Sequence, residues 1–281
     1  MKTLQHFSGW IAVLLAVVSC TKESGDSSPA QYTPLVPVTV EASVPATKVT
    51  LDGNTPLWSE GDQIGIFTED LVLCPAFTAL SGGSATTSFS GQKPEYSVLS
   101  TAFFPYDATA TFSKSGLELD LPQAQSGKAG DAVMVATGSL EDGFTFQNVL
   151  SLVRMSVPAG LNLRKVELVR DDRVTGHFTV NVSASPFKAS SNSPSTYLEN
   201  RAEFSGSTSL SGEYYLTVLP SASKKIELAL TRSDGKIAFI SSTFKTGNPY
   251  TAGTIKNLGT LPTSLTFHDA ALVADPANTQ L

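Results

Sequence analysis

Short runs in which apolar and polar side chains alternate with a period of two limit the fold of this chain more than any other feature. Successive side chains of a β-strand point to opposite faces of the sheet, so such runs indicate strands with one buried face. Gly, Pro, Asn and Asp separate the runs, and stretches with a helical period are almost absent. We therefore predict an all-β protein with strands in the segments Val36–Val44, Gln63–Phe67, Leu117–Leu121, Leu152–Val157, Lys165–Val169, His177–Val182, Tyr214–Leu219 and Ile226–Leu230.

The turn residues add two local predictions. Ser233–Gly235 separates the run Ile226–Leu230 from the run Lys236–Ile240, and its Asp-Gly pair suits the positive φ angles of a tight hairpin turn. This pattern predicts a β-hairpin. The segment Ala184–Ser195 is rich in Ser, Pro and Asn, which predicts a surface loop.

The first residues have the composition of a secretory signal. A positive charge at Lys2 precedes the apolar run Trp10–Val18, which is too short to span a bilayer, and the small residue Ser19 follows. The sequence Val-Val-Ser-Cys that ends at Cys20 resembles the lipobox of bacterial lipoproteins, in which the Cys thiol receives a diacylglycerol and becomes the first residue. We therefore predict a signal peptide at residues 1–19 and lipid attachment at Cys20, with a plain signal peptide as the alternative.

The next residues and the charge balance fit export to a surface. Residues 20–30 are mostly Ser, Gly and charged residues, which predicts a solvated tether behind the lipid. The formal net charge is −6, and loss of Lys2 with the signal makes it −7. A chain with this balance lacks the clustered basic residues that nucleic-acid binding needs. Once Cys20 is acylated, Cys74 has no partner for an internal disulfide, and its apolar neighbours predict a small buried side chain.

The length suggests two domains, because one antiparallel sandwich needs about 100 residues. A short polar break at Glu141–Gly143 lies between two apolar runs and is the predicted seam. The predicted N-terminal domain is therefore residues 31–142 and the predicted C-terminal domain residues 143–281.

The search for catalytic groups finds one pair of motifs, which we interpret as accidental. Ser221–Lys224 fits S-x-x-K and Lys245–Gly247 fits K-T-G, two elements of penicillin-recognising enzymes. In those enzymes the Ser begins a helix and the K-T-G strand comes much later; here Ser221 follows Pro220 in a turn. His177 and His268 are far apart, and Asp171-Asp172 lacks the D-x-D-x-D-G pattern, so these acids are interpreted as solvated loop charges. We predict no enzyme activity, no metal site and no cofactor.

Several longer motifs point to one family. The segment Trp58–Phe67 fits the pattern W-x-x-G-D-x-I-G-[IV]-F and resembles the signature of the fimbrillin-like (Mfa-like) family, which comprises type V fimbrial subunits and related lipoproteins of Bacteroidales-type bacteria. The resemblance covers about Lys48 to Pro262. Further matching elements follow in the order of the family: Ala102–Tyr106, Leu121–Gln123, Asp131–Ala136, Phe146–Ser151, Tyr215–Pro220 and Tyr250–Gly253.

The resemblance implies two tandem transthyretin-like antiparallel β-sandwich domains behind a lipoprotein signal. It also implies a structural or adhesive subunit of a cell-surface fimbria, held in the outer membrane by a lipid anchor. Its expected partners are other fimbrial subunits and ligands on host or bacterial surfaces. The alternative function is that of a monomeric surface lipoprotein of the same fold that binds glycan or host protein.

Assembly by strand exchange is the mechanism that the resemblance implies. In such subunits a trypsin-like protease removes the first strand and opens a groove for a strand of another subunit. Here Val36, Val38 and Val40 mark the buried face of the candidate strand, and Lys48 is the candidate cleavage site, the only basic residue between Lys22 and Lys93. The alternative for Lys48 is an exposed solubilising charge.

Two further predictions concern the C-terminal stretch and Trp58. Leu265 and Phe267 alternate with polar residues near the C-terminus and form a candidate donor strand, with a disordered tail as the alternative. Trp58 stands beside a predicted strand, which favours a buried anchor over a sugar-binding platform.

Overall fold

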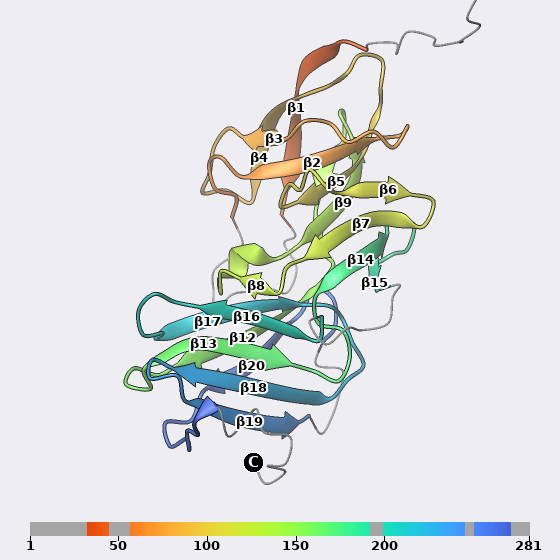
Figure 1. Ribbon diagram of the computed structural model, residues 1–281. Helices are drawn as coiled ribbons and strands as arrows, with labels where there is room; N and C mark the ends of the chain where they lie inside the picture. The colour runs from red at the N-terminus through yellow and green to blue at the C-terminus, as the bar shows by residue number, and fades with distance from the viewer. Residues whose placement is uncertain (1–32, 45–56, 192–198, 245–249, 271–281) are drawn as a thin grey trace, which may run out of the picture. The chain divides into compact units, whose positions relative to one another are not determined.

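The computed structural model describes residues 33–44, 57–191, 199–244 and 250–270. The chain there is all-β, as the period-two pattern predicts, with the short 3₁₀ helix η1 (Ala129–Asp131) (Figure 1). Within these ranges no helix has both the length and the apolar character that a membrane crossing requires. The predicted signal peptide at 1–19 and the tether at 20–30 lie outside the described residues.

The first sheet closes on itself. Its strands are ordered β10-β1-β4-β3-β2-β5-β9-β11, and β9 also pairs with β10, so that every strand except β11 belongs to a closed circuit. We call these paired strands the closed sheet. The bounds are β1 Leu35–Ser43, β2 Gln63–Thr68, β3 Phe77–Ala79, β4 Thr86–Pro94, β5 Leu99–Phe104, β9 Met134–Ser139, β10 Gly143–Thr145 and β11 Gln147–Asn148.

Two strands change partners at a glycine and thereby turn the corners of the closed sheet. β2 pairs with β3 up to Ile64 and with β5 from Gly65 onward. β9 pairs with β5 up to Thr137 and with β10 from Gly138 onward. A Cβ on Gly65 would lie 2.2 Å from the Phe103 ring, and one on Gly138 would lie 2.1 Å from a carbonyl oxygen of β10. Both corners therefore need the close approach that only glycine allows.

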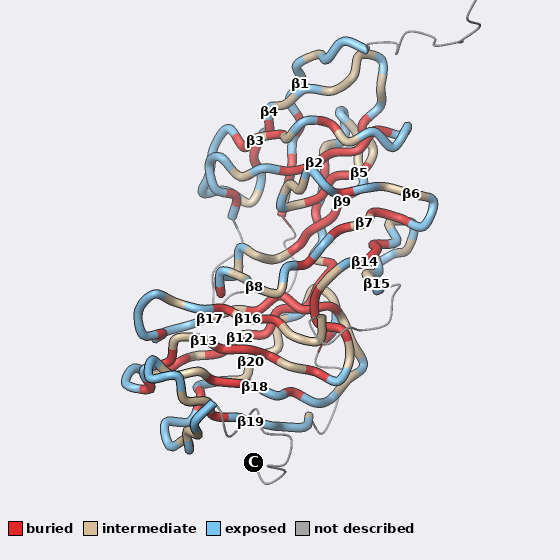
Figure 2. The backbone as a smooth tube through the Cα atoms, in the orientation of Figure 1, coloured by how far each residue is buried: buried red, intermediate tan, exposed pale blue. Residues whose placement is uncertain are grey.

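The interior of the closed sheet is an aromatic core around Trp58, which is 2% exposed. Three phenylalanine rings meet the indole edge-to-face at 5.0 to 5.5 Å. The prediction of a buried anchor at Trp58 is confirmed. Buried residues are red along the backbone in Figure 2. The other large members of this core are Ile64, Ile66, Phe77, Phe89, Leu99, Met134, Phe144 and Phe146.

A second sheet of four strands, ordered β15-β14-β7-β6, covers the opposite faces of β2, β5 and β9. The bounds are β6 Thr111–Ser113, β7 Gly116–Leu121, β14 Gly176–Asn181 and β15 Lys188–Ser190. Phe67, Phe103 and Val135 of the closed sheet pack there against Leu117 and Phe178. The sequence pattern gave β2 one buried face, which is wrong because this covering sheet buries the second.

The remaining strands form the C-terminal sandwich, a three-stranded sheet ordered β17-β12-β20 and a five-stranded sheet ordered β19-β18-β13-β16-β8. Mostly aliphatic side chains from both sheets fill its core, together with Phe204 and Tyr250. The predicted hairpin is confirmed: β18 and β19 are joined at Gly235, which has φ +81°. The bounds are β8 Ala124–Gln125, β12 Ser151–Val157, β13 Leu163–Val169, β16 Arg201–Ser205, β17 Gly212–Val218, β18 Lys225–Arg232, β19 Ile237–Thr243 and β20 Ile255–Thr260.

The predicted seam at Glu141–Gly143 lies where β9 is joined to β10, and these two strands pair with each other. Strands from both sides of the seam also share sheets, because β14 pairs with β7 and β16 pairs with β8. The predicted loop at Ala184–Ser195 contains β15, so a loop over that whole segment is wrong. The division into domains 31–142 and 143–281 stays a prediction.

Candidate functional site

The candidate exchange strand is β1, which is inserted between β4 and β10. It pairs with β4 over nine antiparallel residue pairs and with β10 over two parallel pairs. Val40 is 1% exposed, whereas Val36 and Val38 are partly buried and Thr39 and Glu41 point to solvent. The predicted one-faced burial of this strand is therefore confirmed.

The end of β1 is fixed more firmly than its beginning. Trp58 Nε1 donates a hydrogen bond to the carbonyl oxygen of Ala42 at 3.1 Å. The backbone N–H of Phe146 donates to the carbonyl of Ser43 at 2.9 Å, and that of Val44 donates to Ala85 at 2.8 Å. The part of β1 before Ala42 pairs with β4 alone among the described strands. Removal of β1 would therefore uncover the aromatic core at its Trp58 end.

The other predicted elements of assembly are the lipid attachment site, the cleavage site and the donor strand. Cys20 and Lys48 both lie outside the described residues, so lipid attachment and cleavage stay predictions. The candidate donor segment is described and lies against its own chain: the Arg232 guanidinium is 4.8 Å from the centre of the Phe267 ring, and His268 exchanges two backbone hydrogen bonds of 2.9 Å with Ile237. Its donor role stays a prediction.

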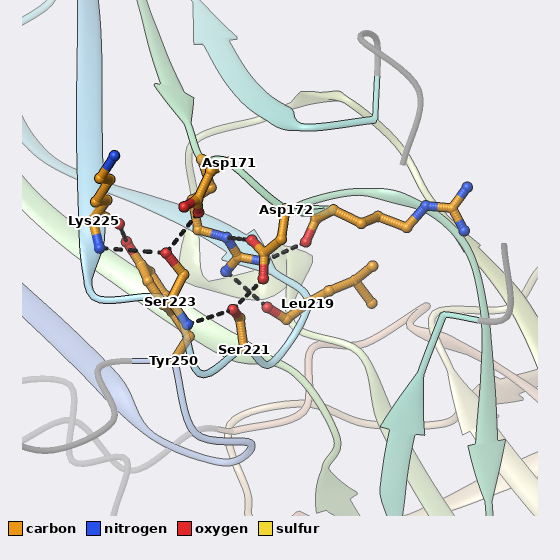
Figure 3. Close-up of polar contacts among 9 residues, drawn as sticks. Asp171, Asp172, Leu219, Ser221, Ser223, Lys225 and Tyr250 are labelled. Atoms are coloured by element: carbon orange, nitrogen blue, oxygen red, sulfur yellow. Dashed lines mark hydrogen bonds and ion pairs between the residues drawn. The ribbon is translucent and has the colours of Figure 1, made fainter. Parts of the chain in front are cut away.

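A polar cluster joins the end of β13 to the segment after β17 (Figure 3). The Arg170 side chain is fully buried, and its Nε donates to Asp172 Oδ1 at 2.7 Å. Its guanidinium also donates to the Leu219 carbonyl at 2.9 Å and stacks 4.5 Å above the Tyr250 ring. Burial lowers the pKa of Arg170 and raises that of Tyr250 to about 12. The cluster is a buried cation with its counter-ion, which the sequence did not predict.

The same cluster settles the placement of Ser221. Its hydroxyl donates to Asp172 and accepts the backbone N–H of Ser223 at 2.8 Å, while Lys224 is exposed. Ser223 in turn donates to Asp171 at 2.8 Å. Asp172 was interpreted as a solvated loop charge, which is wrong because it binds the buried Arg170. The K-T-G segment at 245–247 lies outside the described residues.

The described residues contain no group of three or more His, Cys, Asp or Glu side chains placed to hold a metal ion. His177 lies on β14, with Nδ1 3.4 Å from Asp120 Oδ1. Cys74 is buried, as its apolar neighbours predict, and burial raises the pKa of its thiol to about 11. A thiol with this pKa stays protonated and unreactive near neutral pH.

The fold is shared with solved structures from two Bacteroides species. A candidate cell adhesion protein from Bacteroides uniformis matches with a TM-score of 0.50 and 17% identity, over 83% of this chain and 97% of the other. One from Bacteroides ovatus matches with a TM-score of 0.51 and 14% identity, over 84% and 96%. The tip fimbrial protein Mfa3 from Porphyromonas gingivalis also matches, with 14% identity over 84% and 98%, but its TM-score of 0.35 is too low for an inference. No protein-family model and no curated protein sequence matches the chain.

Proposed function

We propose that this protein is a lipid-anchored subunit of a cell-surface fimbria that assembles by strand exchange at β1. The observation that carries the proposal is the position of β1 between β4 and β10 in the closed sheet. An early strand there contributes Val40 and Ala42 to the core, and the segment that contains Lys48 follows it directly. The fimbrillin-like motifs and the shared fold with candidate cell adhesion proteins support the same role.

The energetics of β1 fit an exchange reaction. Burial of a valine side chain contributes about 1.5 to 3 kcal/mol to stability. Loss of β1 would expose the core that the valines of β1 cover, and an added strand would regain this burial free energy. An extended peptide that enters this place gains main-chain hydrogen bonds to β4 in addition to side-chain burial. The nine pairs between β1 and β4 give the length of the ladder that a donor strand would have to replace.

The proposed location is the outer surface of the outer membrane, with Cys20 as the lipid attachment site. Cys20→Ser should release the protein from the membrane fraction, and unchanged membrane association of this variant would refute the anchor. The proposed partners are other fimbrial subunits. Two transthyretin-like sandwiches in tandem remain our proposal for the domain organisation of this chain.

The decisive experiment is limited trypsin digestion of the folded chain from residue 20 with Cys20→Ser. Mass spectrometry should find cleavage after Lys48 in the wild-type sequence and none there in Lys48→Ala. Lys165→Ala is the control, because Lys165 lies in β13, is paired on one side with β16 and on the other with β18, and should not be cut.

The cut protein is then tested for exchange with a fluorescent peptide of residues 34–44. The wild-type peptide and a Thr39→Asp peptide should bind, because Thr39 faces solvent. A Val40→Asp peptide should not bind, because its charge would enter the core. Absence of cleavage at Lys48, or cut protein that neither binds the peptide nor oligomerises, would favour an uncleaved anchor or a monomeric binder of glycan or host protein.

A further inference from the structure

A pocket of about 310 Å³ opens beside the end of β7. Its wall is apolar, because the buried residues Leu119, Leu121 and Val133 line it. Tyr106 also lines the pocket and is partly exposed. This volume lies near the lower end of the range for ligand cavities, which is about 300 to 1,000 Å³. It therefore suits one long side chain better than a drug-sized molecule. The assembly reaction proposed above uses none of these residues.

Three of the motifs found in the sequence meet at this pocket. One supplies Pro105 and Tyr106, the second Leu121 and Pro122, and the third Asp131 and Val133. The backbone N–H of Tyr106 donates to β2 at 2.9 Å, which fixes the first segment. Since separate segments are brought together by hydrogen bonds within the fold, the pocket is present before any ligand binds.

Further hydrogen bonds make the mouth of the pocket rigid. The Gln125 side chain bonds both backbone groups of Thr217, at 2.7 and 2.8 Å. The Asp131 carboxylate accepts the backbone N–H of Ser126 at 2.8 Å and also the Ser126 hydroxyl. These contacts hold the Asp131 carboxylate in place without a cation.

The pocket is negatively charged. Asp107, Asp120 and Asp131 line it, and none of the described Lys, Arg or His residues does. Asp107 uses Oδ1 to accept two hydrogen bonds from Thr109, and Oδ2 accepts none from the described residues. The Asp120 side chain is 63% exposed, and among the described residues its carboxylate contacts only His177. Carboxylate oxygens therefore remain available at the mouth of an apolar pocket.

We propose that this pocket binds an arginine side chain of a partner polypeptide. The methylene stem would lie on the leucine and valine wall, and the guanidinium would meet the aspartates at the mouth. Arginine fits better than lysine because its planar fork can bond two carboxylate oxygens at once. The proposal does not depend on strand exchange and holds for cut and uncut protein alike.

The test uses the folded chain from residue 20 with Cys20→Ser and a fluorescein-labelled, end-capped hexapeptide with one arginine flanked by leucine and valine. A matched peptide carries citrulline, which has the same shape without the charge. Fluorescence anisotropy should show binding of the arginine peptide and roughly tenfold weaker binding of the citrulline peptide, as expected for one hydrogen bond to a charged group.

Two protein variants place the binding at the pocket. Asp120→Asn should weaken binding of the arginine peptide about fivefold or more. Glu118→Gln is the matched control, because Glu118 is two residues away on β7, also faces His177 and lies outside the pocket, so it should change binding less than twofold. Ala124→Trp should fill the mouth and abolish binding while the thermal midpoint stays unchanged.

Three results would overturn the proposal: equal binding of the two peptides, no binding of the arginine peptide up to millimolar concentration, or equal weakening by Asp120→Asn and Glu118→Gln. Normal binding to a folded Ala124→Trp variant would place the peptide elsewhere and would overturn it as well.

Discussion

The closed sheet and the C-terminal sandwich are both β-structures with buried cores, yet they are stabilised differently. The closed sheet packs phenylalanines around Trp58 and changes direction at Gly65 and Gly138. The sandwich has a mostly aliphatic core between two open-edged sheets and holds the ion pair of Arg170 and Asp172 at one end. The comparison indicates that close packing fixes the first region, whereas a polar cluster fixes the end of the second.

Replacement of the central indole should have the largest effect. Trp58→Ala removes a ring in contact with three phenylalanines and also the hydrogen bond to Ala42. We expect a loss of about 3 to 5 kcal/mol in the free energy of unfolding, measured by urea denaturation. Trp58→Phe should lose much less, and equal losses for the two variants would show that the ring contacts do not hold the closed sheet.

The corner glycine should come next. Gly65→Ala places a methyl group 2.2 Å from the Phe103 ring, which is fully buried, so we expect a loss of about 2 to 3 kcal/mol. Gly130→Ala is the control, because a Cβ there meets no atom within 4 Å and its φ is not positive. Thermal unfolding of the two variants compares them directly, and similar midpoints would contradict a packed corner.

The polar cluster of the sandwich should be worth less. Asp172→Ala leaves the buried Arg170 cation without its carboxylate, but Asp172 itself is 44% exposed, so water replaces part of the interaction. We expect a loss of about 1 to 2 kcal/mol in urea denaturation. Asp171→Ala removes a neighbouring exposed charge that binds only Ser223 among the described residues, and it should cost under about 0.5 kcal/mol.

The smallest effect should be a dependence on alkaline pH in the closed sheet. Burial raises the pKa of the Cys74 thiol from 9.0 to about 11, so the unfolded chain releases this proton at lower pH than the folded chain does. The stability that the buried thiol contributes is fully present below pH 9 and is lost as the pH rises toward 11. The free energy of unfolding should fall by about 1 kcal/mol at pH 10. Cys74→Ala should flatten this slope between pH 8 and 10, and an unchanged slope would assign the effect to other groups.

The sequence predicted the features of the fold that depend on local periodicity. The hairpin at Gly235, the buried Trp58 and the inward face of β1 all follow from alternation or from turn residues. The closure of the first sheet could not be predicted in this way, because closure is set by long-range pairing between β9 and β10. The pairing of β14 with β7 is of the same kind, and it also explains why β2 is buried on both faces.

The candidate site shows the same limit. The residues of β1 could be identified because a strand with one buried face has a simple pattern. The ion pair of Arg170 and Asp172 could not, because the sequence does not show that the guanidinium two residues before Asp172 is buried. One signal was present in the sequence: Arg170 directly follows the predicted strand Lys165–Val169, and a charge at the end of a strand has to be paired if it is buried.

The closed sheet also bears on how the protein avoids aggregation. Strands with neighbours on both sides have their backbone groups paired and offer no edge on which a misfolded chain could grow, whereas β1 before Ala42 is paired on one side only among the described strands. The outer strands of the remaining sheets do have such an edge, and β19 is one of them, with Phe239 half exposed. Its far end is Ser241-Ser242-Thr243, a polar stretch that is a poor template for amyloid-like stacking. The exposed end of this outer strand thus carries hydroxyl groups in place of apolar side chains.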